Sequence, residues 1–185
     1  MKKSLLCVGL LSISTSVFSD GNFYGGIGLQ GGTYEQSNTS GFDGANFAAY
    51  QLTLGKYLTE NNAIEIRLSK GMKGEEFTYG GYDQELKVSS GTSFFYKYDF
   101  DISESAKLYP LVGYTKAKFD VEYSDYNYEY TISDLSGFSY GLGFSANVSD
   151  TVKFNAEYIS YFSDDKSSVT VDYTGVTAGI NVLFD

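Results

Sequence analysis

The sequence predicts an all-β fold, an eight-stranded antiparallel up-and-down transmembrane β-barrel. The first observation is the segment 176–184, where Val176, Ala178, Ile180 and Val182 alternate with small or polar residues. Successive side chains of a strand point to opposite faces, so this segment has one apolar and one polar face. The second observation is an N-terminal segment that resembles a secretory signal peptide. The third is that no later apolar run approaches the ~20 residues that a helix needs to span a membrane. Together they indicate strands with lipid on one side and a barrel lumen on the other.

The N-terminus has the three parts of a signal peptide, which we place at residues 1–19. Lys2 and Lys3 give a positive start, residues 5–11 are largely apolar, and Val17-Phe18-Ser19 provides a cleavage site before Asp20. The mature chain then carries 11 basic and 23 acidic residues, a net charge of −12. It contains no Cys, so no disulfide stabilises it and the strands themselves must hold the fold.

The composition of the remaining chain, residues 20–185, is that of one barrel domain. The full sequence has 18 Tyr, 14 Phe, 21 Gly and a single Pro. Aromatic residues suit a pleated surface, and Gly suits strands that enclose a narrow lumen. The mean hydropathy is only −0.20, as expected when every second strand residue meets lipid.

Eight alternating segments follow one another along the chain. In chain order they are 22–34, 47–58, 64–69, 86–98, 108–119, 138–145, 152–158 and 176–184. The face predicted to meet lipid carries, segment by segment, Ile27 and Leu29; Tyr50 and Leu52; Ile66 and Leu68; Val88, Phe94 and Tyr96; Val112 and Tyr114; Phe138 and Leu142; Phe154 and Tyr158; Val176 and Ile180. The face predicted to line the lumen carries Gly28 and Gln30; Gln51 and Gly55; Glu65 and Arg67; Lys87, Ser93 and Lys97; Gly113 and Thr115; Ser139 and Gly143; Asn155 and Glu157; Thr177 and Gly179.

Short and long connections alternate between these segments. The short ones are 59–62, 99–106 and 147–151, and the other four are longer, polar and acidic. Short periplasmic turns with longer external loops are the usual layout of an outer-membrane barrel. We therefore expect four external loops, with both ends of the chain on the periplasmic side.

Four stretches of the sequence resemble the small eight-stranded outer-membrane barrels of the OmpX/Ail kind and, more broadly, the OmpA-type barrel domain. They are 108–114 (LYPLVGY), 137–144 (GFSYGLGF), 152–157 (VKFNAE) and 178–184 (AGINVLF). The resemblance implies a monomer in the outer membrane of a Gram-negative bacterium, in contact with membrane lipid and lipopolysaccharide. It also implies that the barrel assembly machinery reads the C-terminal strand. Asp185 departs from the pattern, because members usually end on the aromatic residue itself.

The resemblance implies a structural or surface-interactive role, since members include adhesins and complement-evasion proteins. Enzymes with related barrels resemble one another in needing His, the side chain most often used for general acid–base catalysis at neutral pH. This chain contains no His. We therefore expect no catalytic residue, and we predict no cofactor and no metal site.

Charged residues on the lumen face form the first candidate site: Glu65, Arg67, Lys87 and Glu157. Counted from the periplasmic turns, Arg67 and Glu157 lie at similar heights on opposite strands, which predicts a contact across the lumen. One interpretation is a gate whose ion pair can switch partners, for example towards Lys87. The other is a static salt bridge that offsets the cost of burying a lone charge.

Four tyrosines in the third long connection form the second candidate site: Tyr123, Tyr126, Tyr128 and Tyr130. Tyr provides a large contact area at low entropy cost, so the four indicate a surface that binds a host or surface ligand. They are equally consistent with the upper ends of strands or with an aromatic girdle near the lipid headgroups.

Acidic residues gather in the connections expected to be external: Glu75, Glu76, Asp83, Glu85, Asp120, Glu122, Asp125, Glu129, Asp164 and Asp165. They suit a basic partner or bridging divalent cations, or they only solvate the surface. The sign of the charge excludes nucleic acid as a partner.

Two rival functions remain open at this stage. A narrow channel for ions or small solutes is one, although eight strands leave room for little more than side chains. A soluble lipocalin-like ligand binder is the other. It would need its apolar face inside, whereas here charged residues share the face of the glycines.

Overall fold

The computed structural model describes residues 22–37, 44–79, 81–123, 128–166 and 169–184. The signal peptide predicted at residues 1–19 and the terminal Asp185 lie outside these residues. Within the described ranges, no helix is long and apolar enough to cross a membrane.

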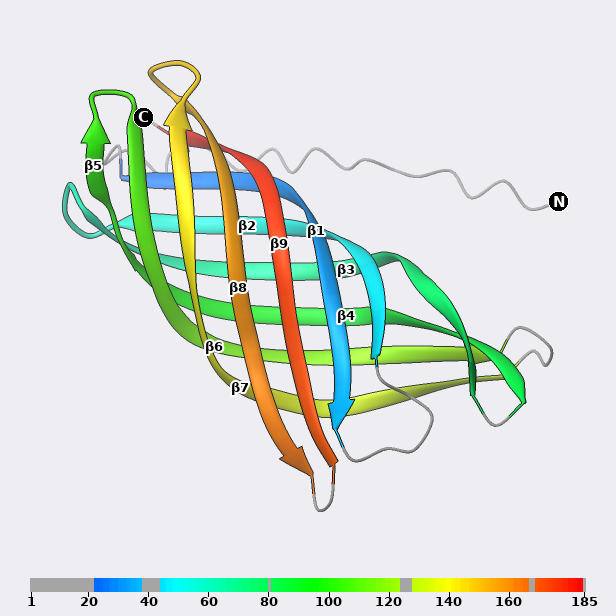
Figure 1. Ribbon diagram of the computed structural model, residues 1–185. Helices are drawn as coiled ribbons and strands as arrows, with labels where there is room; N and C mark the ends of the chain where they lie inside the picture. The colour runs from blue at the N-terminus through cyan, green and yellow to red at the C-terminus, as the bar shows by residue number, and fades with distance from the viewer. Residues whose placement is uncertain (1–21, 38–43, 80, 124–127, 167–168, 185) are drawn as a thin grey trace, which may run out of the picture.

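The described fold consists of strands that pair antiparallel with their neighbours (Figure 1). They are β1 (Phe23–Ser37), β2 (Gly44–Tyr57), β3 (Asn62–Tyr79), β4 (Tyr82–Tyr98), β5 (Phe100–Ser103), β6 (Ala106–Tyr123), β7 (Tyr128–Asn147), β8 (Val152–Lys166) and β9 (Val169–Phe184). β1 pairs with β9 and β4 pairs with β6, which closes eight strands into a ring. The predicted all-β, antiparallel, up-and-down barrel is therefore confirmed.

The short strand β5 continues β4 after a one-residue interruption at Asp99. Lys97 pairs with Leu111 and Phe100 pairs with Leu108, so the register against β6 is the same on both sides of the break. Pro110 lies between those two partners on β6. Because proline has no backbone N–H to donate, it interrupts the ladder without shifting the strands.

The outer wall of the ring is apolar and its interior is mostly polar or aromatic, as the alternation predicted. Ile27, Leu142 and Ile180 on the outer wall are 43–60% exposed, whereas Arg67 and Ser139 are buried inside. Such a wide exposed apolar surface is stable only against lipid or another apolar partner.

At the end opposite the short turns, two hairpins extend far beyond the apolar wall. β3, β4, β6 and β7 have 18, 17, 18 and 20 residues, whereas ~9–11 residues suffice to cross the membrane. Their outer parts, residues 74–79, 82–89, 119–123 and 128–133, pair with one another and form what we call the external sheet. Figure 1 shows these two hairpins side by side, running away from the hairpin of β8 and β9.

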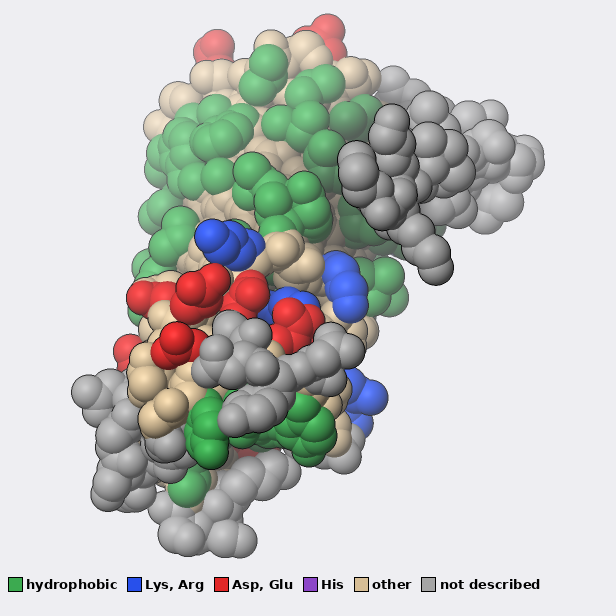
Figure 2. All heavy atoms as spheres, turned by 90° about the vertical axis from the view of Figure 1, so that its right-hand side faces the viewer, with side chains coloured by type: hydrophobic (Ala, Val, Ile, Leu, Met, Phe, Trp, Pro, Cys, Tyr) green, Lys and Arg blue, Asp and Glu red, His purple; other side chains and the backbone are tan. Residues whose placement is uncertain are grey.

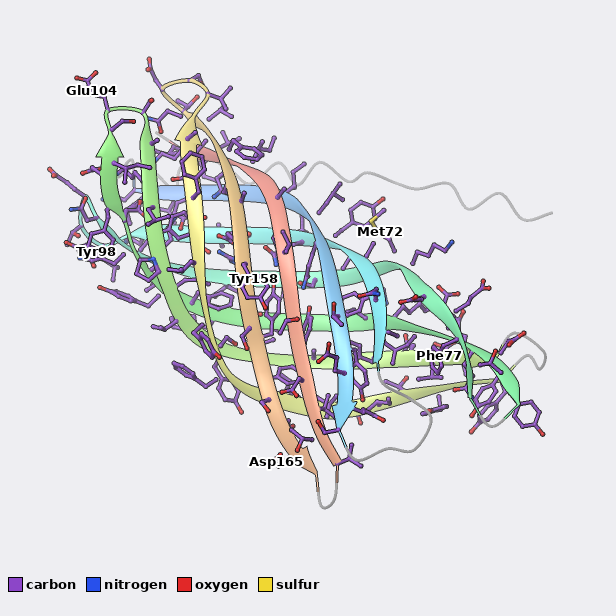
Figure 3. All side chains as sticks on the ribbon, in the orientation of Figure 1. Met72, Phe77, Tyr98, Glu104, Tyr158 and Asp165 are labelled. Carbon is purple, nitrogen blue, oxygen red and sulfur yellow. The ribbon has the colours of Figure 1, made fainter. Side chains whose placement is uncertain are left out.

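The external sheet corrects the predicted extent of the loops. Glu75 and Glu76 lie in β3, and Asp83 and Glu85 lie in β4, all paired in the ladder instead of forming a loop. The strands face no lipid here, so their outward positions carry charged residues and the sequence reads as a loop. Figure 3 places Glu104 and Asp165 at opposite ends of the barrel, with Phe77 on the external hairpin of β3 and β4.

A seam separates the external sheet from the neighbouring wall. The pairing of β7 with β8 begins at Tyr140 with Ser160 and ends at Asn147 with Lys153. The outer half of β7, Tyr128–Ser139, therefore pairs with β6 but not with β8 within the described residues.

Candidate functional site: the lumen and the external sheet

The guanidinium of Arg67 on β3 lies in the lumen between two carboxylates. Its Nη1 donates to Oε2 of Glu157 on β8 at 2.5 Å, and its Nη2 donates to Oε1 of Glu157 at 2.9 Å. Its Nε donates to Oε2 of Glu65 at 2.7 Å. The contact across the lumen between Arg67 and Glu157, predicted from their heights, is thus present. Glu65, on the same strand as Arg67, completes the arrangement, and each buried charge has an opposite partner.

A tyrosine from a second strand completes the hydrogen bonding of Glu65. The hydroxyl of Tyr24 on β1 donates to Oε1 of Glu65 at 2.5 Å. To reach it, the ring of Tyr24 crosses Gly55 on β2, where a Cβ would lie 2.1 Å from the ring Cζ. Gly55 is therefore the residue that leaves room for this hydrogen bond.

The same arrangement recurs on the opposite wall. The hydroxyl of Tyr109 on β6 donates to Oε1 of Glu157 at 2.7 Å. Its ring crosses Gly143 on β7, where a Cβ would lie 2.3 Å from Cε2 of Tyr109. Each carboxylate that holds Arg67 is thus supported by a tyrosine two strands away, over a glycine on the strand between them.

Alternating charges continue from this cluster towards the end of the barrel with the short turns. Nζ of Lys97 lies 3.6 Å from Oε1 of Glu65 and 3.6 Å from Oδ1 of Asp99. The same ammonium lies 4.5 Å from the ring centroid of Tyr109, within the range of a cation–π interaction. Nζ of Lys107 lies 3.9 Å from Oδ2 of Asp99. The half of the lumen nearer the short turns is therefore filled by paired charges and tyrosines.

The half of the lumen nearer the external sheet is closed by aromatic rings, which we call the aromatic plug: Tyr34, Phe47, Phe119, Phe162 and Tyr173. All five side chains are at most 5% exposed. The ring centroids of Tyr34 and Phe119 are 4.8 Å apart, and those of Phe119 and Tyr173 are 5.5 Å apart. Such edge and tilted contacts are favourable between aromatic rings. The plug separates the charged half of the lumen, nearer the short turns, from the external end of the barrel.

Lys87 does not belong to the lumen network, which corrects that prediction. Val88 is 1% exposed inside the barrel, and Lys87 forms an ion pair with Glu122 on the outer face of the external sheet. The cause is a register shift between Val88 and Ser90, which reverses the inward and outward faces in the part of β4 that belongs to the external sheet. A gate in which Arg67 switches towards Lys87 is therefore excluded by position.

Three of the four predicted tyrosines lie in strands of the external sheet, and Tyr126 lies outside the described residues. Tyr123 on β6 pairs with Tyr128 on β7. Its ring centroid is 5.6 Å from that of Tyr128, 6.2 Å from that of Tyr130 and 6.4 Å from that of Tyr82 on β4. Sequence reasoning missed Tyr82, because the pairing of the two hairpins was needed to bring it here.

The opposite face of the external sheet is acidic. By register it carries Glu76, Asp83, Glu85, Asp120, Glu122 and Glu129. The one described ion pair on this face joins Lys87 to Glu122, and this hydrogen bond raises the pKa of Lys87. No group of three or more metal-ligating side chains is gathered within the described residues.

A closed antiparallel ring with an apolar wall and a filled polar lumen defines a membrane β-barrel. The chain belongs to the outer membrane protein β-barrel domain family, whose model matches residues 4–184. It is therefore a protein of the outer membrane, where its wall lies in lipid. No curated protein matches the sequence of this chain.

Solved structures share the fold at low sequence identity. Neisserial surface protein A (NspA) is 16% identical, covers 88% of this chain and 97% of its own, and has a TM-score of 0.66. Ail, the attachment invasion locus protein of Yersinia pestis, is 16% identical, covers 87% and 98%, and has a TM-score of 0.53. Ail in complex with the heparin analogue sucrose octasulfate is 17% identical with the same coverage and a TM-score of 0.55. At these identities the likeness concerns the fold alone.

Proposed function

We propose that this protein is an outer-membrane anchor that presents its external sheet to a protein on another cell or surface. The observation that carries the proposal is the exposed tyrosine cluster around Tyr123. Tyr128 is 61% exposed, Tyr82 is 45% exposed and Tyr130 is 39% exposed. Large, rigid aromatic side chains in one cluster are typical of protein-binding surfaces.

The seam beside β7 supports the same proposal. Between Tyr128 and Ser139, β7 has a ladder partner on one side only among the described residues. An extended segment of another protein can add to such an edge as a further strand. Ser136 at this edge donates its backbone N–H to Oδ2 of Asp164 at 3.1 Å, so the part nearest the tip, from Tyr128 to Ile132, is the favoured position.

The charge of the external sheet favours a neutral or basic partner. Ail has been seen with a sulfated, strongly anionic ligand, and Ail is similar to this chain in fold. Here the outer face of the sheet carries six carboxylates, and the mature chain predicted above has a net charge of −12. A polyanion would be repelled by this surface, whereas basic segments would be attracted to it.

The alternative functions receive less support. Conduction through the lumen would require a path past the aromatic plug and the ion cluster of Arg67. A soluble lipocalin-like binder would require apolar side chains inside and polar ones outside, the reverse of the observed wall. His, the side chain most often used for general acid–base catalysis, is absent from the sequence, which makes catalysis the less supported function. We further propose residues 1–19 as the signal peptide and β9 as the strand read by the assembly machinery.

The test is binding by bacteria that display the protein and lack their own adhesins. Attachment to host cells and to immobilised extracellular matrix proteins is compared between the wild type and a variant with Tyr123→Ser, Tyr128→Ser and Tyr130→Ser. The control is Tyr98→Ser, a similarly exposed Tyr at the opposite end of the barrel. Each variant must keep the different gel migration of its heated and unheated forms.

We expect the triple variant to lose attachment by at least about tenfold, since aromatic anchors dominate interfaces, and the Tyr98 variant to bind as the wild type does. Equal attachment by the triple variant and the wild type would contradict the proposal.

A further inference from the structure

Two tyrosines face each other at the tip of the external sheet. Tyr123 on β6 and Tyr128 on β7 are direct partners in the antiparallel ladder, so their side chains lie on the same face. Their ring centroids are 5.6 Å apart and the rings are inclined by 55°. Tyr128 is 61% exposed and Tyr123 is partly exposed. Figure 2, in which tyrosine is coloured with the hydrophobic residues, shows such side chains beside carboxylates at this end of the molecule. The backbone thus holds the pair together in reach of the external medium.

Two tyrosine pairs in the lumen have closer rings but lack this access. The ring centroids of Tyr161 and Tyr173 are 4.4 Å apart, and those of Tyr24 and Tyr57 are 5.1 Å apart. Tyr24, Tyr161 and Tyr173 are at most 2% exposed. Hydrogen bonds also hold the hydroxyls of Tyr24 and Tyr173 in place. A reagent outside the cell does not reach these rings, and the close packing of the lumen prevents them from moving. The pair at the tip is therefore the one open to chemistry.

The closeness of two phenols matters for one-electron oxidation. A haem peroxidase supplied with hydrogen peroxide takes one electron and one proton from a phenol and leaves a phenoxyl radical. Two radicals held side by side join far faster than radicals on separate molecules, because their meeting needs no diffusion. Rotation about the side-chain bonds of Tyr123 and Tyr128 brings together the ring carbons ortho to the two hydroxyls.

We propose that Tyr123 and Tyr128 are a site of oxidative cross-linking, at which a peroxidase and hydrogen peroxide join the two rings as dityrosine. The new bond forms between the two ortho carbons. Each ring then regains its aromaticity as the hydrogen on the joined carbon moves to the oxygen, which restores both phenols. The protein loses two hydrogen atoms in total, and one hydrogen peroxide is reduced to two molecules of water.

The cross-link closes the tip of the hairpin of β6 and β7 with a covalent bond. The mature chain predicted above has no Cys, so dityrosine supplies a tie of the kind that a disulfide supplies in other exported proteins. Exposed tips are the usual points of fraying and proteolytic cleavage, and the bond protects this one. The site rests on the geometry of the pair and is independent of any partner that the external sheet binds.

The experiment treats the folded, detergent-purified barrel, at low protein concentration, with a haem peroxidase and hydrogen peroxide. Dityrosine fluorescence measures the yield. The protein is then cleaved before Asp125, which lies between the two tyrosines in the sequence. The two fragments stay joined only through a cross-link, and mass spectrometry identifies the joined residues.

The test variants are Tyr123→Phe and Tyr128→Phe, which keep the aromatic ring and remove the phenol. The matched control is Tyr98→Phe. Tyr98 is 36% exposed at the opposite end of the barrel, and its ring lies 4.8 Å from that of Phe100, which has no hydroxyl to oxidise. None of these measurements involves attachment, so the cross-link is tested separately from the proposed function.

We expect the wild type to give fragments joined between Tyr123 and Tyr128 within one molecule. Each test variant should give at most about a tenth of the joined fragments, because a radical on the remaining tyrosine has lost its adjacent phenol. The Tyr98 variant should give as many as the wild type. Unjoined fragments from the wild type, or cross-linked dimers in their place, would overturn the site. Joined fragments that persist in either test variant would overturn its assignment to this pair.

Discussion

Arg67 on β3 and Glu157 on β8 meet across the lumen in a two-bonded ion pair, with N–O distances of 2.5 and 2.9 Å. The two strands lie on opposite sides of the ring, so this pair ties one wall of the barrel to the other. Glu65 also binds the guanidinium, and Lys97 lies near Glu65. Loss of any one of these charged groups therefore leaves an oppositely charged neighbour incompletely paired.

Replacement of Arg67 should therefore destabilise the barrel strongly. We expect Arg67→Ala to lower the free energy of unfolding by about 3–5 kcal/mol, the usual effect of breaking a buried pair. Glu157→Gln should also be destabilising, and the double variant should recover part of the loss, with a coupling energy of about 0.5–3 kcal/mol. Urea titrations of refolding into lipid vesicles measure these values. Strict additivity would show that the two residues do not interact.

The tyrosines that support the carboxylates depend on two glycines. Gly55→Ala or Gly143→Ala should cost about 1–3 kcal/mol, because the added methyl group displaces the ring of Tyr24 or Tyr109. The control is Gly31→Ala, where an added Cβ meets nothing within 4 Å; its effect should stay within about 0.5 kcal/mol. The same unfolding titrations apply, and equal effects at Gly31 and Gly55 would refute the explanation.

The outer wall should tolerate charge according to depth. Ile180→Arg, in the middle of the apolar wall, should cost about 2–4 kcal/mol, whereas Gly31→Arg near the headgroups should cost at most about 1 kcal/mol. Gly31 lies at the border because its partner Ala48 pairs in turn with Lys73. Refolding into vesicles of one lipid gives both values, and the reverse order would show that the wall is misplaced in the membrane.

The alternation of the sequence was sufficient to predict the ring and the contact of Arg67 with Glu157. It also predicted which residues face lipid and which face the lumen in the half of the barrel nearer the short turns. It failed at Lys87, because one register shift in β4 reverses the faces while the sequence continues to alternate. It also treated much of the external sheet as loop, since strands that leave the lipid lose the apolar face by which they are recognised.

The support for the ion cluster could not be read from the sequence either. Tyr24 and Tyr109 reach their carboxylates over glycines on the strands between, and only the register shows which glycine lies beside which ring. Ser139 is similar. Alternation places it towards the lumen, but its hydroxyl donates to the backbone oxygen of Tyr161 at 2.5 Å in a closely packed interior.

The central claim is that the protein presents a surface and does not provide a path, because paired charges and the aromatic plug fill its lumen. Single-channel recording of the purified barrel in planar lipid bilayers tests this claim most directly. We expect the wild type to insert without stepwise conductance, and folded protein must be recovered from the same membranes. Reproducible conductance steps from the wild type would contradict the account and favour a channel.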